Sequence, residues 1–140
     1  FLPRLAAARD RAGFGAELRA AARQVILPAL LALGLLWLLL PQALALLYRE
    51  GLPAGRVDAI TFFAGDALRM VSWIFLCGLF ARGAGWAVTG GELLSLPLFA
   101  ALLFLLPGPL SLAATGAAWM LAYAAYAAFN AWALRRRLAA

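Results

Sequence analysis

The sequence contains no histidine and no lysine, it has one cysteine, and charged residues make up only 13% of its 140 residues. Without histidine, the chain lacks the commonest general base and the commonest metal ligand. Cys77 by itself cannot form an intrachain disulfide or a zinc site, and its place in an apolar run is typical of a small buried hydrophobe. So few charges cannot coat a soluble domain of this size, so the composition argues against a soluble globular protein. No metal or cofactor is expected, because the usual ligands are missing.

Apolar residues dominate instead. The chain is 66% hydrophobic and its mean hydropathy is +0.93, whereas ordinary soluble domains are about half apolar. All twelve basic residues are arginines and the formal net charge is +6, which raises the possibility of nucleic-acid binding. These arginines cluster at the ends of apolar runs, as topology signals do, so nucleic acid is not an expected partner.

Four apolar runs make up most of the chain: 24–48, 57–81, 86–106 and 110–134. Each provides the roughly 20 residues that a helix needs to cross the hydrocarbon core. The runs are too long for membrane strands and lack their period of two. The sequence therefore predicts an all-α integral membrane protein with four transmembrane helices, which the short connections make antiparallel.

Basic segments flank these runs. For residues 1–23 we expect a short surface helix, a bend near Phe14, and the start of a second helix, and residues 135–140 form a basic tail. With four spans, nine arginines lie on the side of the two termini and two on the opposite side, while Arg69 is embedded. This asymmetry predicts cytoplasmic termini. Because the chain begins at Phe1 without a charged leader, we expect no signal peptide and a piece of a longer protein.

The second run carries Asp66 and Arg69 near its middle, where a charge costs about 2.5–3.5 kcal/mol on insertion scales. On a helix the polar and small residues of this run share about 140° of arc: Asp58, Thr61, Gly65, Asp66, Arg69, Ser72 and Trp73. Two interpretations remain open. Either Asp66 and Arg69 neutralise each other as a structural ion pair, or Arg69 faces a wet cavity for an anionic group, with Asp66 holding it until cargo arrives.

Glu92, in the third run, is the other embedded acid. In apolar surroundings a glutamate is suited to proton coupling. The alternative is an interfacial glutamate paired with Arg82 or with the arginines of the tail.

The fourth run places polar and aromatic residues within about 80° of arc: Thr115, Trp119, Tyr123, Tyr126 and Asn130. Much of the remaining circumference is alanine and glycine, which we expect to face neighbouring helices. Aromatic residues often anchor helices at the membrane interface. Trp119 and Tyr126 reach the middle of the run, which favours a stripe that lines a cavity and grips sugar rings.

Motifs of enzymes are missing from the sequence. The stretch "GWAVTGG" places Gly85 and Gly90 at phosphate-loop spacing, but Gly91 stands where the lysine is required. No set of serine, histidine and acid exists, because the chain has no histidine. An enzyme is therefore not expected, since Asp66 and Glu92 would be its only embedded acids.

Five stretches resemble the C-terminal part of an O-antigen flippase, a polysaccharide translocase of the multidrug and oligosaccharidyl-lipid exporter superfamily. They occur in the family's order: "FLPRL" at 1–5, "LYREG" at 47–51, "GDALRMVSWIF" at 65–75, "GGELL" at 90–94 and "GAAWMLAYAAY" at 116–126. The resemblance implies the last four helices of a twelve-helix transporter built of two bundles. By resemblance, Asp66 and Arg69 fall in the family's "GD…K/R" motif, and Glu92 matches its acidic position.

The family carries undecaprenyl-diphosphate-linked oligosaccharide across the bacterial inner membrane, driven by ion gradients. The implied partners are this cargo, the bilayer and an N-terminal bundle missing from this chain, without which the chain is not expected to transport. We expect alternating access, with ion coupling through Asp66 and Glu92 and substrate binding through Arg69, Asp66, Trp73, Trp119, Tyr123, Tyr126 and Asn130. The alternatives are a flippase for another lipid-linked precursor, such as that of peptidoglycan, a non-transporting scaffold subunit, and an enzyme of lipid carriers.

Overall fold

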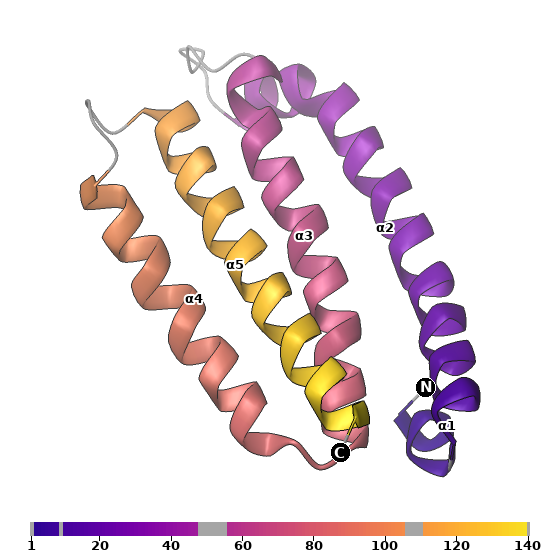
Figure 1. Ribbon diagram of the computed structural model, residues 1–140. Helices are drawn as coiled ribbons and strands as arrows, with labels where there is room; N and C mark the ends of the chain where they lie inside the picture. Colours follow the sequence, from indigo (N-terminus) through magenta and orange to yellow (C-terminus); the bar gives the residue numbers. More distant parts are fainter. Residues whose placement is uncertain (1, 9, 48–55, 106–110, 140) are drawn as a thin grey trace.

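The computed structural model describes residues 2–8, 10–47, 56–105 and 111–139. Within these ranges every regular element is a helix (Figure 1): α1 (Leu2–Ala7), α2 (Arg11–Leu47), α3 (Arg56–Ala81), α4 (Gly85–Leu105) and α5 (Leu112–Ala139). Helices α2 to α5 contain four segments long and apolar enough to cross a membrane. The predicted all-helical chain with four potential membrane spans is therefore confirmed.

The four long helices alternate in direction and lie side by side, in the order α4, α5, α3, α2 (Figure 1). Helix α3 packs most extensively against α5 and on its other side against α2, while α4 packs mainly against α5. Both chain termini lie at the same end of the bundle, beside α1 (Figure 1). We call this end the terminal end.

The helix bounds differ from the predicted ones mainly at α2 and α5. Helix α2 has 37 residues and is about 55 Å long, so it exceeds the roughly 30 Å of a hydrocarbon core. Helix α5 continues to Ala139, through residues predicted as a tail, because arginine, leucine and alanine all favour helix and no breaker follows position 134. The predicted span limits at 48, 106 and 110 lie outside the described residues.

The predicted bend near Phe14 is wrong, because Phe14 lies inside α2 and the chain turns between α1 and Arg11. Asp10 explains this position. Its carboxylate accepts a hydrogen bond from the Gly13 backbone N–H at 3.2 Å, and its carbonyl accepts one from the Phe14 N–H at 3.1 Å. Asp10 is thus the N-cap of α2. Gly13 suits this cap, since a Cβ there would lie 2.7 Å from an Asp10 carboxylate oxygen.

Replacing Asp10 with alanine is expected to destabilise the first turn of α2 by about 1 kcal/mol, because the Gly13 amide loses its acceptor. Hydrogen exchange measured at the amides of Gly13 and Phe14 should become faster by several-fold. Asp10→Asn, which keeps a capping oxygen, is the matched control. Equal protection in the alanine variant and the unaltered chain would show that the cap is unimportant.

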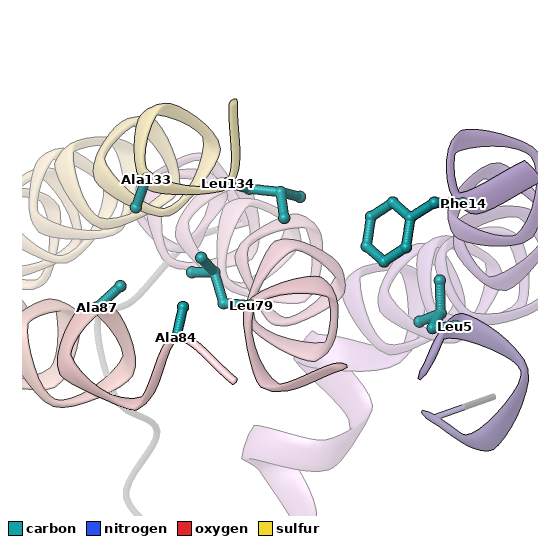
Figure 2. Close-up of a cluster of buried hydrophobic side chains, with 7 residues drawn as sticks. All are labelled: Leu5, Phe14, Leu79, Ala84, Ala87, Ala133 and Leu134. Carbon is teal, nitrogen blue, oxygen red and sulfur yellow. The ribbon is translucent and has the colours of Figure 1, made fainter. Parts of the chain in front are cut away.

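A cluster of buried apolar side chains ties the terminal end together (Figure 2). It draws on α1, α2, α3, α4, α5 and the turn after α3: Leu5, Phe14, Leu79, Ala84, Ala87, Ala133 and Leu134. The turn uses Gly83 at a φ of 66°, a left-handed conformation that glycine adopts without strain. We call these residues the terminal core, and it fixes α1 and the start of α2 against the remaining helices.

Large apolar side chains cover much of the outer surface. The most apolar stretch of α2 has no buried residue, and Phe104 on α4 is 90% exposed. In water such a surface would favour aggregation. In a bilayer the acyl chains cover it, so the surface agrees with the membrane-spanning lengths.

Candidate functional site

Helices α3 and α5 approach closely because small residues lie between them. A Cβ at Gly65 would collide with the Trp119 indole, and one at Gly116 would collide with the Thr61 hydroxyl and approach the Phe62 ring to 2.8 Å. Ala118 and Ala122 of α5 are buried as well. The prediction that the alanine and glycine positions of this run face neighbouring helices is confirmed at these positions.

Asp66 is joined to α5 across this interface. The Trp119 indole N–H donates a hydrogen bond to its carboxylate at 3.2 Å. The same indole packs edge-on against Phe99 of α4, with ring centres 5.3 Å apart. Trp119 therefore links α3, α4 and α5, and the Asp66 carboxylate fixes its orientation.

Arg69 lies among aromatic rings rather than beside an acid. Its guanidinium carbon is 5.0 Å from the ring centre of Trp73, 5.6 Å from that of Tyr123 and 6.0 Å from that of Trp119. These distances are within the range of cation–π attraction. Arg69 is half-buried, and it forms neither an ion pair nor a hydrogen bond with any side chain in the described ranges.

The structure therefore contains no direct Asp66–Arg69 pair, although the two residues are neighbours on one helix. The acid is engaged by Trp119, while the cation lies against π-faces. The first interpretation was an ion pair in which the two residues neutralise each other, and the described side chains do not form this pair. The same holds for the idea that Asp66 retains Arg69 before cargo arrives.

Glu92 is bound by a tyrosine. The Tyr126 hydroxyl donates a hydrogen bond to its carboxylate at 2.6 Å, which joins α4 to α5. The alternative partners suggested by the sequence, Arg82 and the arginines of the tail, do not pair with Glu92 among the described residues. Whether Glu92 couples transport to an ion remains a prediction.

Asn130 forms a second joint, between α5 and α3. Its side-chain N–H donates to the Ser72 hydroxyl at 2.9 Å, and both residues are fully buried. The other side-chain atom of Asn130, its carbonyl oxygen, has no hydrogen-bond partner among the described residues. A Cβ at Gly91 would lie 2.9 Å from this oxygen, so the glycine brings α4 close to it.

The predicted site residues thus fall into two groups. In the first group, residues of α3 and α5 lie together around the Arg69 side chain: Asp66, Arg69, Trp73, Trp119 and Tyr123. We call these five residues the arginine site. The second group holds helices together: Tyr126 with Glu92, and Asn130 with Ser72.

Two further expectations concern the ends of the polar faces. The Thr115 hydroxyl donates to the Ser111 carbonyl at 2.9 Å, and its place on the stripe remains a prediction. The side chain of Asp58 lies outside the described residues. The cavity-lining role of Tyr126 and Asn130 remains a prediction, because both are buried in this structure.

Sequence reasoning did not pair the residues of these joints. Ser72 and Asn130 are 58 positions apart, and the ring of Phe14 in α2 lies 4.3 Å from the guanidinium of Arg82, which follows the end of α3. Ser72 was placed correctly on the polar face of α3 by its helical period. Its partner could not be chosen, since several polar residues of α5 share a face.

The arginine site can bind an anion without covalent chemistry. A guanidinium presents donors in a planar fork that matches phosphate oxygens, and here no described carboxylate occupies that fork. The exposed ring of Trp73 and the rings of Trp119 and Tyr123 offer flat apolar faces beside it. No group of acids and cysteines suited to a metal occurs within the described ranges.

Replacing Tyr126 with phenylalanine is expected to weaken the contact between α4 and α5 by about 0.6 kcal/mol, the average for hydrogen bonds between membrane helices, and by no more than about 1.7 kcal/mol. The ring and its packing remain, while Glu92 loses its donor. Unfolding of the reconstituted chain by denaturing detergent measures the change.

Tyr123→Phe is the matched control, because the Tyr123 hydroxyl makes no hydrogen bond to a described residue although its ring lies one turn away. It should leave the unfolding midpoint unchanged. An equal loss in both variants would contradict a specific bond between Tyr126 and Glu92.

Comparison with known proteins identifies no relative: no family model, no curated protein and no solved structure matches the chain.

Proposed function

We propose that the chain is the C-terminal part of a flippase that moves undecaprenyl-diphosphate-linked oligosaccharide across the bacterial inner membrane. The cargo's diphosphate binds the Arg69 guanidinium, its sugars pack against the aromatic rings, and its lipid tail stays in the bilayer. One bundle moves against another around this midplane site. Both termini are cytoplasmic, and no bond of the cargo is broken.

One observation carries the proposal. Arg69 lies halfway along an apolar helix, where a charge is costly, yet no described acid neutralises it. Asp66 is the nearest acid along the helix, but its carboxylate accepts a hydrogen bond from Trp119 instead. An unneutralised cation at this depth supports a site whose counter-ion arrives with a ligand.

A scaffold subunit is the second candidate, and a specific observation favours it. The Tyr126–Glu92 and Asn130–Ser72 hydrogen bonds connect neighbouring helices, as interactions that stabilise a helix bundle do. In that case the arginine site would be a further packing contact, its charge stabilised by the three rings.

Binding of undecaprenyl diphosphate to the 140-residue chain in nanodiscs tests the proposal. We expect saturable binding of the labelled diphosphate that undecaprenol, which lacks the phosphates, does not displace. Displacement by undecaprenol as effective as by the diphosphate would rule out the site. Hydrolysis of the labelled diphosphate would instead indicate an enzyme.

Transport is tested in the protein that joins this chain to the expected N-terminal bundle. Two labelled cargoes are incorporated into separate vesicles: the lipid-linked oligosaccharide and the lipid-linked peptidoglycan precursor. The rate at which each becomes accessible to a membrane-impermeant reagent measures its movement across the bilayer. Faster exposure of the oligosaccharide cargo is expected. A preference for the peptidoglycan precursor would correct the cargo, and no acceleration of either would favour the scaffold.

A further inference from the structure

The terminal end collects arginines from separate parts of the chain. Arg4 precedes Leu5, Arg82 lies in the segment between Leu79 and Ala84, and residues 135–137 follow Leu134. The apolar neighbours of these arginines all pack in the terminal core (Figure 2). These arginines therefore lie at the same end of the chain's fold as the core, and we call them the terminal arginines: Arg4, Arg82, Arg135, Arg136 and Arg137.

Acids do not compensate this charge. None of the terminal arginines forms an ion pair with a described residue. Of the acids near this end, Asp10 is engaged as the cap of α2, and Glu17 makes no ion pair among the described residues. The terminal end therefore presents uncompensated positive charge.

Two of the terminal arginines are held in place by aromatic rings. The Arg82 guanidinium lies 4.3 Å from the Phe14 ring centre, and Arg136 lies 4.5 Å from that of Trp132. The Nε of Arg82 is buried and has no hydrogen-bond partner among the described residues. Stacking holds both guanidinium groups in place, and neither is paired with an acid among the described residues.

The surroundings place these donors where lipid headgroups lie. Trp132 is 44% exposed on α5, and tryptophan residues collect at the membrane–water interface. Arg136 follows it by about one turn, just beyond the apolar part of α5. Leu2, on the short helix at this end, is 46% exposed and offers an apolar contact to the bilayer surface.

We propose that the terminal arginines bind the headgroups of anionic phospholipids and so hold α1 and the ends of α3 and α5 at the membrane surface. Phosphates of separate lipids accept from Arg82 beside Phe14 and from Arg136 beside Trp132, and the acyl chains run along the exposed apolar surface. Basic segments next to the membrane are attracted to anionic lipids in this manner. This site is distinct from the arginine site and does not depend on the flippase proposal.

Spin-labelled lipids test the proposal on the 140-residue chain reconstituted in phosphatidylcholine vesicles. The fraction of motionally restricted probe gives the relative association constant of phosphatidylglycerol over phosphatidylcholine. We expect a preference for phosphatidylglycerol that falls by up to about fivefold for each arginine removed. The triple variant R135Q, R136Q and R137Q should lose most of it and remain folded, since these three residues are exposed.

Arg23→Gln is the matched control for the single variant Arg136→Gln, because each removes one exposed arginine. Arg23 is an exposed arginine on α2, nine positions after Phe14 and therefore on the opposite face of that helix. It should keep the preference of the unaltered chain. An equal loss in this control would show general charge attraction rather than a site. Absence of any preference in the unaltered chain would overturn the proposal and point to an acidic protein partner.

Arg82 is tested by two substitutions, because its stacking on Phe14 also supports the terminal core. Arg82→Lys keeps the charge and should retain most of the lipid preference. Arg82→Gln should lower the preference by up to about fivefold. If both variants retained the full preference while remaining folded, Arg82 would be excluded from the site.

Discussion

Replacing Arg69 with alanine is expected to abolish most cargo binding while leaving insertion into the membrane intact. A hydrogen bond to a charged group contributes about 1.5–3 kcal/mol, so binding of the diphosphate should weaken by about ten- to a hundredfold. At the same time, removing a charge from the middle of α3 removes an insertion cost of about 2.5–3.5 kcal/mol. The lost contacts with three aromatic rings act against this gain.

The two candidate functions predict opposite results for this variant. A binding site predicts a folded chain that has lost its ligand, whereas a packing contact predicts a destabilised chain with unchanged transport in the longer protein. Arg69→Lys separates charge from shape, because lysine keeps the charge but not the planar fork. It should bind the diphosphate more weakly than arginine and more tightly than alanine. Unchanged binding in Arg69→Ala would contradict the proposed function.

Replacing Gly116 with valine is expected to separate α3 from α5. The Cβ alone would collide with the Thr61 hydroxyl and lie 2.8 Å from the Phe62 ring, and the two methyl groups of valine need further space. Overpacking of this kind costs about 1–3 kcal/mol. Because α3–α5 is the largest helix interface of the chain, the unfolding midpoint in denaturing detergent should fall clearly.

Gly34→Val provides the control for this prediction. A Cβ at Gly34 meets no atom within 4 Å, so valine there changes the residue type without crowding a neighbour. Both variants replace a helical glycine by the same β-branched residue, and only one of them lies in a close interface. If Gly34→Val were as unstable as Gly116→Val, the effect would come from helix propensity and not from packing.

The sequence predicted the helices well where the apolar runs were long. The prediction was wrong where a single capping interaction decided at which residue a helix begins. Glycines at 13 and 15 indicated a break near Phe14, but the Asp10 carboxylate caps α2 and keeps both glycines inside it. Helical period also predicted which face of α3 is polar. This face meets α5 through Asp66 and Ser72, whose side chains hydrogen-bond to Trp119 and Asn130.

The pairing of the polar residues was beyond the sequence. Asp66 and Arg69 are adjacent on one helix, and this spacing alone suggested an ion pair. The hydrogen bond between Trp119 and Asp66 depends on Gly65, because the missing Cβ leaves room for the indole to lie against α3. Similarly, Tyr126 rather than an arginine binds Glu92 because α4 packs along α5 at that level.

Composition and hydrophobic runs alone determined that this chain is helical and suited to a membrane, because crossing lipid requires long apolar segments with internally paired backbone groups. The tertiary structure decided which polar groups meet. It joins Asp66 to Trp119, places Arg69 among aromatic rings with no acid of the described residues paired to it, and brings segments that carry the terminal arginines to one end of the bundle. These outcomes depend on contacts between helices distant in the sequence, which the spacing within any one helix does not encode.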